Sequence, residues 1–185
     1  AMSIASLAGT VVILALSTFI VKVASKIGKK ELSIIGCFIS AASFILLFII
    51  HTHNVWVWVG LIIVATIGTS MFNMVIWAMI TDVIDESEVQ TGVRQDGTIY
   101  SVYSFARKLG QACSSGLSGV LLSIIGYTSV TAFDPKVVDG IYNITCLVPA
   151  GGMILLLLAL WFLYPLNKKR VEENAEKLRI KRNEK

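Results

Sequence analysis

Residues 32–79, LSIIGCFISAASFILLFIIHTHNVWVWVGLIIVATIGTSMFNMVIWAM, contain no Asp, Glu, Lys or Arg. A transmembrane helix needs only about 20 apolar residues to cross a hydrocarbon core about 30 Å thick, so this stretch is long enough for two. Its one polar interruption lies at 51–54, and Trp56 and Trp58 follow directly, as is typical of a helix end at the membrane interface. We therefore predict two transmembrane helices, at about 32–51 and 55–80.

Further uncharged blocks lie on both sides of this stretch. The chain of 185 residues is 55% hydrophobic, which is more than a soluble domain of this length usually carries, because such a domain has a surface to solvate. We predict an all-α membrane protein in which a basic tail, 167–185, follows about five transmembrane helices. The predicted helices are at about 3–22, 32–51, 55–80, 97–126 and 140–165.

The basic residues alternate between the connections. The 22–31 connection holds four lysines and the 167–185 tail holds eight basic residues, whereas 51–54 holds none and 127–139 holds one. Because cytoplasmic loops are enriched in Lys and Arg, we predict a cell-membrane protein with its amino terminus outside and its carboxy terminus in the cytoplasm. This distribution accounts for the net charge of +4 without a nucleic-acid partner.

An odd number of spans and an external amino terminus are unusual for a transporter built from paired repeats. Both features are expected of the carboxy-terminal part of a longer protein, or of a truncated gene product. The tail offers pairs such as Glu173 with Lys177 along a possible helix. On general grounds it is expected to be a solvated, frayed end, and contact with anionic lipid is the functional alternative.

Two of the predicted helices carry a polar face. In the third span the face recurs every three or four residues, at Thr66, Ser70, Asn73, Trp77 and Thr81. In the fourth it comprises Tyr100, Ser104, Arg107, Lys108, Gln111, Ser115 and Ser118. Charged groups at mid-membrane are costly, so these faces are expected to line a bundle interior or a water-filled cavity. The alternatives are hydroxyls that bond back to their own helix, and a cation that pairs with a carboxylate for stability alone.

The fourth predicted helix also carries small residues at a spacing of four, Ala112 with Gly116 and Ser115 with Gly119. Such pairs predict that a neighbouring helix approaches closely there. Pro149, with Gly151 and Gly152, is expected to weaken or kink the last helix near its middle.

Four acids follow the third predicted helix without a break, at Asp82, Asp85, Glu86 and Glu88. The basic connection, with Lys26, Lys29 and Lys30, is predicted on the same side of the membrane. Opposite charges at a cytoplasmic rim can hold a gate that opens and closes. The alternative is a solvated, charged loop.

Residues 81–127, TDVIDESEVQTGVRQDGTIYSVYSFARKLGQACSSGLSGVLLSIIGY, resemble the tenth-to-eleventh-helix segment of the glycoside–pentoside–hexuronide:cation symporters of the major facilitator superfamily. The shared pattern is a pair of acids three residues apart, a basic stretch, a Tyr-Ser followed by Lys, and a glycine-rich helix ending in Ile-Gly-Tyr. The basic loop KVASKIGKKE is similar to the loop after the eighth helix. The chain then corresponds to helices 8–12 of a twelve-helix fold.

The resemblance implies a role for particular positions. Lys108, with Ser104 and the adjacent Arg107, is implied beside the coupling-cation site, where Na⁺, Li⁺ or H⁺ would bind. The resemblance implies that Asn73 and its neighbourhood line the sugar cavity. From the polar helix faces we predict that Ser70, Trp77 and Gln111 belong to the same lining. The cytoplasmic gate is implied to contain Asp82, Asp85, Glu88 and Arg94, opposite Lys26 and Lys29. Glu86 and Ser87 replace the family's tyrosine and glycine. The principal cation- and sugar-binding acids of the family lie in an amino-terminal half.

These observations predict the carboxy-terminal part of a sugar or glycoside:cation symporter that works by alternating access. No enzyme chemistry and no cofactor are expected, because the sequence shows no nucleophile–base pair, phosphate loop or metal-ligand cluster, and His51 and His53 are isolated. Cys37, Cys113 and Cys146 are expected to be apolar fillers. Two alternatives remain: a related carrier for another substrate class, such as a lysolipid, and a non-transporting membrane sensor or assembly subunit.

Overall fold

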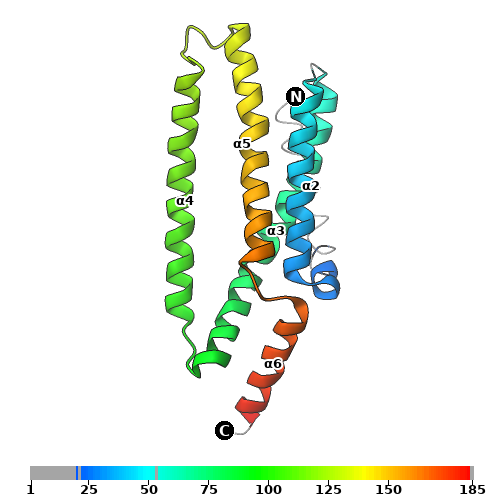
Figure 1. Ribbon diagram of the computed structural model, residues 1–185, viewed down its shortest axis with the longest axis vertical. Coiled ribbons are helices and arrows are strands. Elements are labelled where there is room, and N and C mark those ends of the chain that lie inside the picture. Colours follow the sequence, from blue (N-terminus) through cyan, green and yellow to red (C-terminus); the bar gives the residue numbers. More distant parts are fainter. Residues whose placement is uncertain (1–19, 21, 53, 184–185) are drawn as a thin grey trace.

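The computed structural model describes residue 20, residues 22–52 and residues 54–183. The predicted span 3–22 lies almost wholly outside the described residues, as does His53. The helices are α2 (Lys29–Ile50), α3 (Val55–Thr91), α4 (Asp96–Ile124), α5 (Pro135–Phe162) and α6 (Lys168–Asn183), and residues 22–27 are also helical. The described part is an all-α membrane protein (Figure 1).

Three of these helices, α2, α3 and α5, are long and apolar enough to cross a membrane. Helix α4 has 29 residues, which is also long enough, but its polar face leaves it outside that group. Helix α3 has 37 residues and is therefore roughly 55 Å long at 1.5 Å per residue, well beyond a hydrocarbon core of about 30 Å. It continues eleven residues past the predicted end at 80, so the acids from Asp82 to Glu88 are helical rather than part of a loop.

The polar cluster at 51–54 forms the connection between α2 and α3. His51 closes α2 in the left-handed conformation, with φ of 44°, and its amide donates to the Leu47 carbonyl at 3.1 Å. Asn54 begins α3 by accepting a hydrogen bond from the Trp56 amide at 3.0 Å. Such caps satisfy backbone groups that the helix ends leave without a partner. The sequence break therefore coincides with a pair of helix caps.

Helices α2 and α3 approach each other closely where Gly36 meets Gly68. A Cβ atom built on either glycine would lie 2.5 Å from the carbonyl oxygen of the other. Only glycine permits this approach, and the surrounding core includes Cys37, Val75 and Met79. The small-residue contact predicted on α4 differs: a Cβ at Gly116 or Gly119 would meet no described atom within 4 Å.

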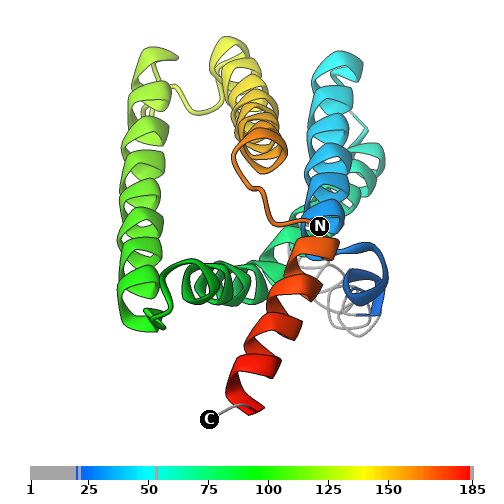
Figure 2. The ribbon, with the colours of Figure 1, turned by 60° about the horizontal axis from the view of Figure 1, so that its bottom comes forward.

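Helix α5 packs against α2, and the Tyr142 hydroxyl donates to the Leu47 carbonyl at 2.8 Å. It is one continuous helix with Pro149 in its interior. Helix α4 stands apart from the others and contains no buried residue (Figure 2). Its contact with the rest of the described chain is made chiefly to α3.

The tail is not the frayed end expected from the sequence. It forms α6, which packs against the extended end of α3 and buries Asn174 and Leu178. A helix rich in i,i+4 charge pairs gains some stability alone, but burial of an apolar side chain against a neighbour is what holds it in place. The pairs formed are Lys168–Glu172 and Lys169–Glu173 rather than Glu173–Lys177.

Candidate functional site

A pocket of about 560 Å³ lies between α3 and α4. Its walls are Phe72, Asn73, Ile76 and Trp77 from α3, and Tyr103, Ala106 and Arg107 from α4. Asn73 and Trp77 are four residues apart on α3, and Tyr103 and Arg107 are four residues apart on α4, so each pair shares one face of its helix. The volume lies within the range of small-molecule sites in proteins, about 300–1,000 Å³.

Aromatic rings and one cation join the two helices at this pocket. The Trp77 ring stacks on Tyr100 with centroids 5.9 Å apart and meets the Tyr103 ring edge-on at 5.5 Å. The Arg107 guanidinium carbon lies 5.5 Å from the Trp77 ring centroid, a cation–π arrangement. Aromatic pairs and cation–π contacts each contribute on the order of 1 kcal/mol, so this cluster orders the facing walls of the pocket.

The structure places the predicted cavity residues in two groups. Asn73 and Trp77 line the pocket, whereas Ser70 and Gln111 do not. Ser70 is buried, and its hydroxyl donates to the Thr66 carbonyl one turn earlier at 2.7 Å. The Ser115 hydroxyl likewise donates to the Gln111 carbonyl at 3.0 Å. These hydroxyls follow the back-bonding alternative.

The residues predicted beside the cation site are also separated. Arg107 faces the pocket, while Ser104 and Lys108 are not among its walls. Adjacent residues of a helix project about 100° apart, so Arg107 and Lys108 lie on different faces of α4. Lys108 is exposed and forms no ion pair with any described residue. Tyr103 was missed by the sequence reasoning, although its spacing from Tyr100 and Arg107 would have identified it.

A second set of polar contacts gathers at the end of the molecule where α2 begins. The Lys29 ammonium lies 2.6 Å from an Asp82 carboxylate oxygen, and it also donates to the Ala78 carbonyl at 3.3 Å. The Asp82 side chain is 6% exposed and that of Lys29 is 31% exposed. The other Asp82 oxygen is buried without a described partner. This pair connects the basic connection 22–31 to the acidic end of α3.

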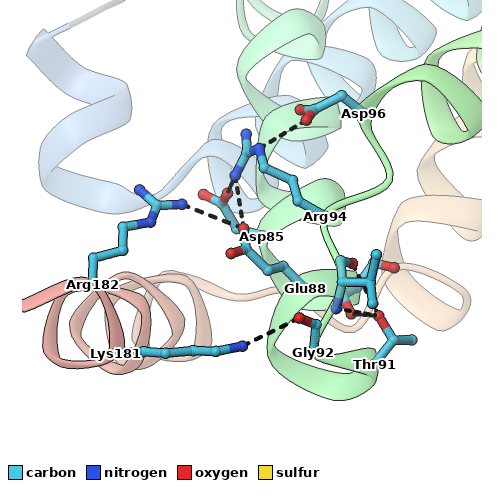
Figure 3. Close-up of polar contacts among 10 residues, drawn as sticks. Asp85, Glu88, Thr91, Gly92, Arg94, Asp96, Lys181 and Arg182 are labelled. Atoms are coloured by element: carbon cyan, nitrogen blue, oxygen red, sulfur yellow. Dashed lines mark hydrogen bonds and ion pairs between the residues drawn. The ribbon is translucent and has the colours of Figure 1, made fainter. Parts of the chain in front are cut away.

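Arg94 holds the next acids of α3 (Figure 3). Its guanidinium donates to Asp85 at 2.9 Å, to Glu88 at 3.0 Å and to Asp96 at 2.8 Å. The hydrogen bond from Arg94 lowers the pKa of Glu88, and these carboxylates, Asp85 first, raise the pKa of Arg94. Asp85 and Glu88 thus pair within the 81–96 segment rather than with the lysines of 22–31. The Lys26 backbone carbonyl, instead of its ammonium, takes part by accepting from Lys168 at 2.9 Å.

Helix α6 supplies partners that the sequence reasoning did not assign. Arg170 forms an ion pair with Glu86, and Asn174 donates to the same carboxylate at 2.5 Å. Arg182 reaches Glu88 at 3.3 Å and Lys181 donates to the Gly92 carbonyl at 3.3 Å (Figure 3). The alternation of charge along the tail was the sequence feature that could have indicated these contacts. Its contacts could not be assigned because the tail lies more than 80 positions from these acids.

The docking of α6 is expected to depend on pH through Glu86. The Arg170 hydrogen bond, aided by Asn174 and Gln90 and opposed by partial burial, lowers the pKa of Glu86 to about 2. A carboxyl with a depressed pKa in the folded state stabilises it above the ordinary value of about 4.3, and this contribution is lost as pH falls towards 2. Amide hydrogen-exchange protection of α6 should therefore decrease between about pH 5 and pH 2.

Glu86→Gln should remove most of this pH dependence, whereas Glu176→Gln should leave it in place. Glu176 is the matched control because, among the described residues, its ion pair is with Arg179 inside α6. Equal pH dependence of α6 protection in the wild type and in Glu86→Gln would contradict the assignment.

Comparisons with known proteins identify the family of this chain. Residues 1–168 match the protein family described as MFS/sugar transport protein. The chain is 34% identical over 149 residues to a glucuronide carrier protein homolog of Escherichia coli (strain K12), with 80% of this chain and 32% of that protein covered. It is 35% identical over 163 residues to the uncharacterized symporter YjmB of Bacillus subtilis (strain 168), with 88% and 35% covered.

A third relative is an Escherichia coli (strain K12) protein provisionally named as a sulfoquinovose importer, 31% identical over 156 residues, with 84% of this chain and 33% of that protein covered. The chain thus spans about a third of the length of the curated relatives it matches. The family and these relatives are carriers and symporters, not enzymes. The chain therefore belongs to the MFS/sugar transport protein family, as a partial, glycoside/cation symporter-like member.

Proposed function

We propose that the chain forms the carboxy-terminal part of a secondary transporter that moves a sugar or glycoside together with a cation. The observation that carries this proposal is the pocket between α3 and α4, which combines stacked aromatic rings with Asn73 and Arg107. Aromatic faces pack against the C–H faces of sugar rings, and amide and guanidinium groups donate hydrogen bonds to hydroxyl oxygens. The family match supports transport rather than enzymatic conversion of such a substrate.

In this proposal Lys108 belongs to the cation-coupling region and not to the sugar pocket. It lies twelve residues into α4, roughly 18 Å along the axis and near the middle of a core about 30 Å thick. An unpaired ammonium at that depth is costly, and Lys108 has no ion-pair partner among the described residues. Carboxylates from amino-terminal helices would pair with it, and a bound Na⁺, Li⁺ or H⁺ would compete with Lys108 for them.

The charged end of the molecule serves as the cytoplasmic gate in this proposal. The protein lies in the cell membrane with 22–31, the α3–α4 connection and α6 on the cytoplasmic side, as the distribution of basic residues supports. Alternating access would then break and re-form the contacts of Lys29 with Asp82 and of α6 with α3. The bilayer and an amino-terminal set of helices complete the assembly.

Uptake by the complete protein that contains this chain tests the proposal. Membrane vesicles should accumulate a labelled sugar or glycoside when a Na⁺, Li⁺ or H⁺ gradient is imposed, and accumulation should stop when the gradient is collapsed. Accumulation of a labelled lysolipid instead would favour a carrier for that substrate class. Absence of uptake for both classes would favour a sensor or assembly subunit.

Lys108→Ala should abolish the stimulation of uptake by the coupling cation while insertion into the membrane stays unchanged. A Lys suits this role because its ammonium is compact and mobile, so Lys108→Arg should also impair coupling. The measurement is the ratio of uptake with and without the cation gradient at matched protein levels. Lys136→Ala is the control, because Lys136 is an exposed lysine near the start of α5. Normal stimulation in Lys108→Ala would remove Lys108 from the coupling mechanism.

A further inference from the structure

One face of α6 carries the contacts that hold it against α3, and we call it the docking face. Its residues lie three or four positions apart until the two adjacent cations at its end: Arg170, Asn174, Leu178, Lys181 and Arg182. The polar members bind Glu86, Glu88 and the backbone carbonyl of Gly92, the residue that ends α3 in the left-handed conformation. The docked α6 therefore covers the last turns of α3 and the start of its connection to α4 (Figure 3).

This docking face is chiefly cationic. Three of its five residues are basic, one is an amide and one, Leu178, is apolar. Lys177 adds a fourth cation on the same side, because it lines a groove of about 520 Å³ between α6 and the end of α3. Helix α6 is therefore held mainly by cations bound to carboxylates. A partner that supplies other anionic oxygens can take the place of Glu86 and Glu88.

The opposite face of α6 has a different charge. Glu172 and Glu176 are each two positions from Asn174, so they project roughly 160° away from it. They pair with Lys168 and Arg179 within α6. This side therefore mixes both signs, and the cationic surface of α6 is the docking face itself. Binding of an anionic partner to that surface and docking on α3 exclude each other.

The surface of the bilayer is always within reach of α6. Helix α5 is apolar and long enough to cross a membrane, and it ends at Phe162. Residues 163–167 separate it from α6, and a segment of that length spans at most about 18 Å when fully extended. Clusters of basic residues directly beside a transmembrane helix bind anionic lipid headgroups. Helix α6, with seven basic and three acidic residues, is such a cluster.

We propose that the docking face of α6 is an exchangeable surface that binds either the acidic end of α3 or the anionic headgroups of the surrounding bilayer. In the first state α6 fixes the connection between α3 and α4, because Arg182 shares Glu88 with Arg94 of that connection. In the second state Arg94 alone holds Glu88, and α6 no longer restrains the connection. The anionic lipid content of the membrane thereby sets how freely α3 moves against α4, the two helices that line the α3–α4 pocket.

The test follows α6 directly in the complete protein that contains this chain, in a background without other cysteines. Spin labels at Val93→Cys and Ala175→Cys report the distance between the α3–α4 connection and α6 by pulsed electron paramagnetic resonance. Both positions are exposed and neither belongs to the docking face. In nanodiscs of phosphatidylcholine the distance should show one docked population. Replacing about half of this lipid with phosphatidylglycerol should add a second population at a different distance, with α6 released from α3.

Two variants should move the ratio of released to docked α6 in opposite directions. Glu86→Gln/Glu88→Gln removes the anions of α3 and leaves α6 unchanged, so the ratio should rise by on the order of tenfold. Lys177→Gln removes one cation from the lipid-binding side and leaves the ion pairs to α3 in place, so the ratio should fall by about fivefold. Lys136→Gln is the charge-matched control. It lies at the start of α5, at the other end of the molecule (Figure 1), and should leave the ratio unchanged.

An identical distance distribution in the two lipids would overturn the inference, as would a Lys177→Gln ratio equal to that of the wild type. Inorganic pyrophosphate, added to phosphatidylcholine nanodiscs, separates a soluble anion from a lipid headgroup. Release of α6 by pyrophosphate to the same extent as by phosphatidylglycerol would refute the assignment to lipid. If Glu86→Gln/Glu88→Gln does not fold, Lys177→Gln decides in its place. These distances require no substrate, so their outcome is independent of the uptake that tests the proposed transport.

Discussion

Replacing Gly68 with Ala should separate α2 from α3 and destabilise the protein. The new Cβ would lie 2.5 Å from the Gly36 carbonyl oxygen and 2.9 Å from the Ser40 amide nitrogen. Both are backbone atoms of α2, so no side-chain rotation can relieve the clash. Overpacking of this kind costs about 1–3 kcal/mol, more than the roughly 1 kcal/mol by which Ala favours a helix over Gly.

The matched control is Gly60→Ala, in the same helix. A Cβ at Gly60 would meet no described atom within 4 Å, so this variant should be neutral or slightly stabilised. Gly36→Ala should resemble Gly68→Ala, and the double variant should cost less than the sum because both act on one contact. Thermal unfolding in detergent, followed by size-exclusion chromatography, measures these differences. Equal stability of Gly60→Ala and Gly68→Ala would show that the helices do not meet at these glycines.

Replacing Lys29 with Ala should destabilise the closed arrangement of the charged end by about 2–4 kcal/mol. The substitution leaves the Asp82 carboxylate buried without its cation, and breaking one partner of a buried pair typically costs about 3–5 kcal/mol. We expect a smaller loss than this typical cost because Lys29 is partly exposed, so solvent partly screens its charge. The measurement is unfolding stability, together with hydrogen exchange at the start of α2.

The double variant Lys29→Met/Asp82→Asn should recover most of this loss, because it removes both charges together. Lys26→Ala is the control. Lys26 lies three residues earlier in the sequence, its ammonium has no ion-pair partner among the described residues, and its backbone carbonyl accepts from Lys168. A double variant as unstable as Lys29→Ala would mean that Lys29 acts through packing rather than through its charge.

The contacts that connect distant helices could not be read from the sequence. Charge alternation predicted that the basic 22–31 connection would meet acids of 81–96, and Lys29 does lie against Asp82. The same reasoning could not predict which basic residue pairs with each of the remaining acids. In the structure these acids pair with Arg94 and with Arg170 and Arg182 of α6. Several cations compete for a few carboxylates, and the rotation of each helix about its axis decides which side chains are within about 4 Å.

The small-residue prediction for α4 finds no partner helix within the described chain, for a related reason. Spacing favoured close contact at Gly116 and Gly119 of α4, whereas the close contact lies at Gly36 and Gly68. Small residues at a spacing of four permit a helix to approach, but they do not name its neighbour. That neighbour depends on how α2, α3 and α4 cross, and in the described chain α4 stands apart (Figure 2).

The sequence by itself determined that this is an all-α membrane protein, because a long uncharged run has to be buried in lipid or protein whatever its neighbours are. It also located the connection at 51–54, because local caps and polar residues suffice to end one helix and begin the next. Only the tertiary structure decided that Arg107 and not Lys108 faces Trp77. The two cations are adjacent in the sequence and differ by about 100° around α4, and the rotation of α4 relative to α3 comes from packing between the helices rather than from either helix alone.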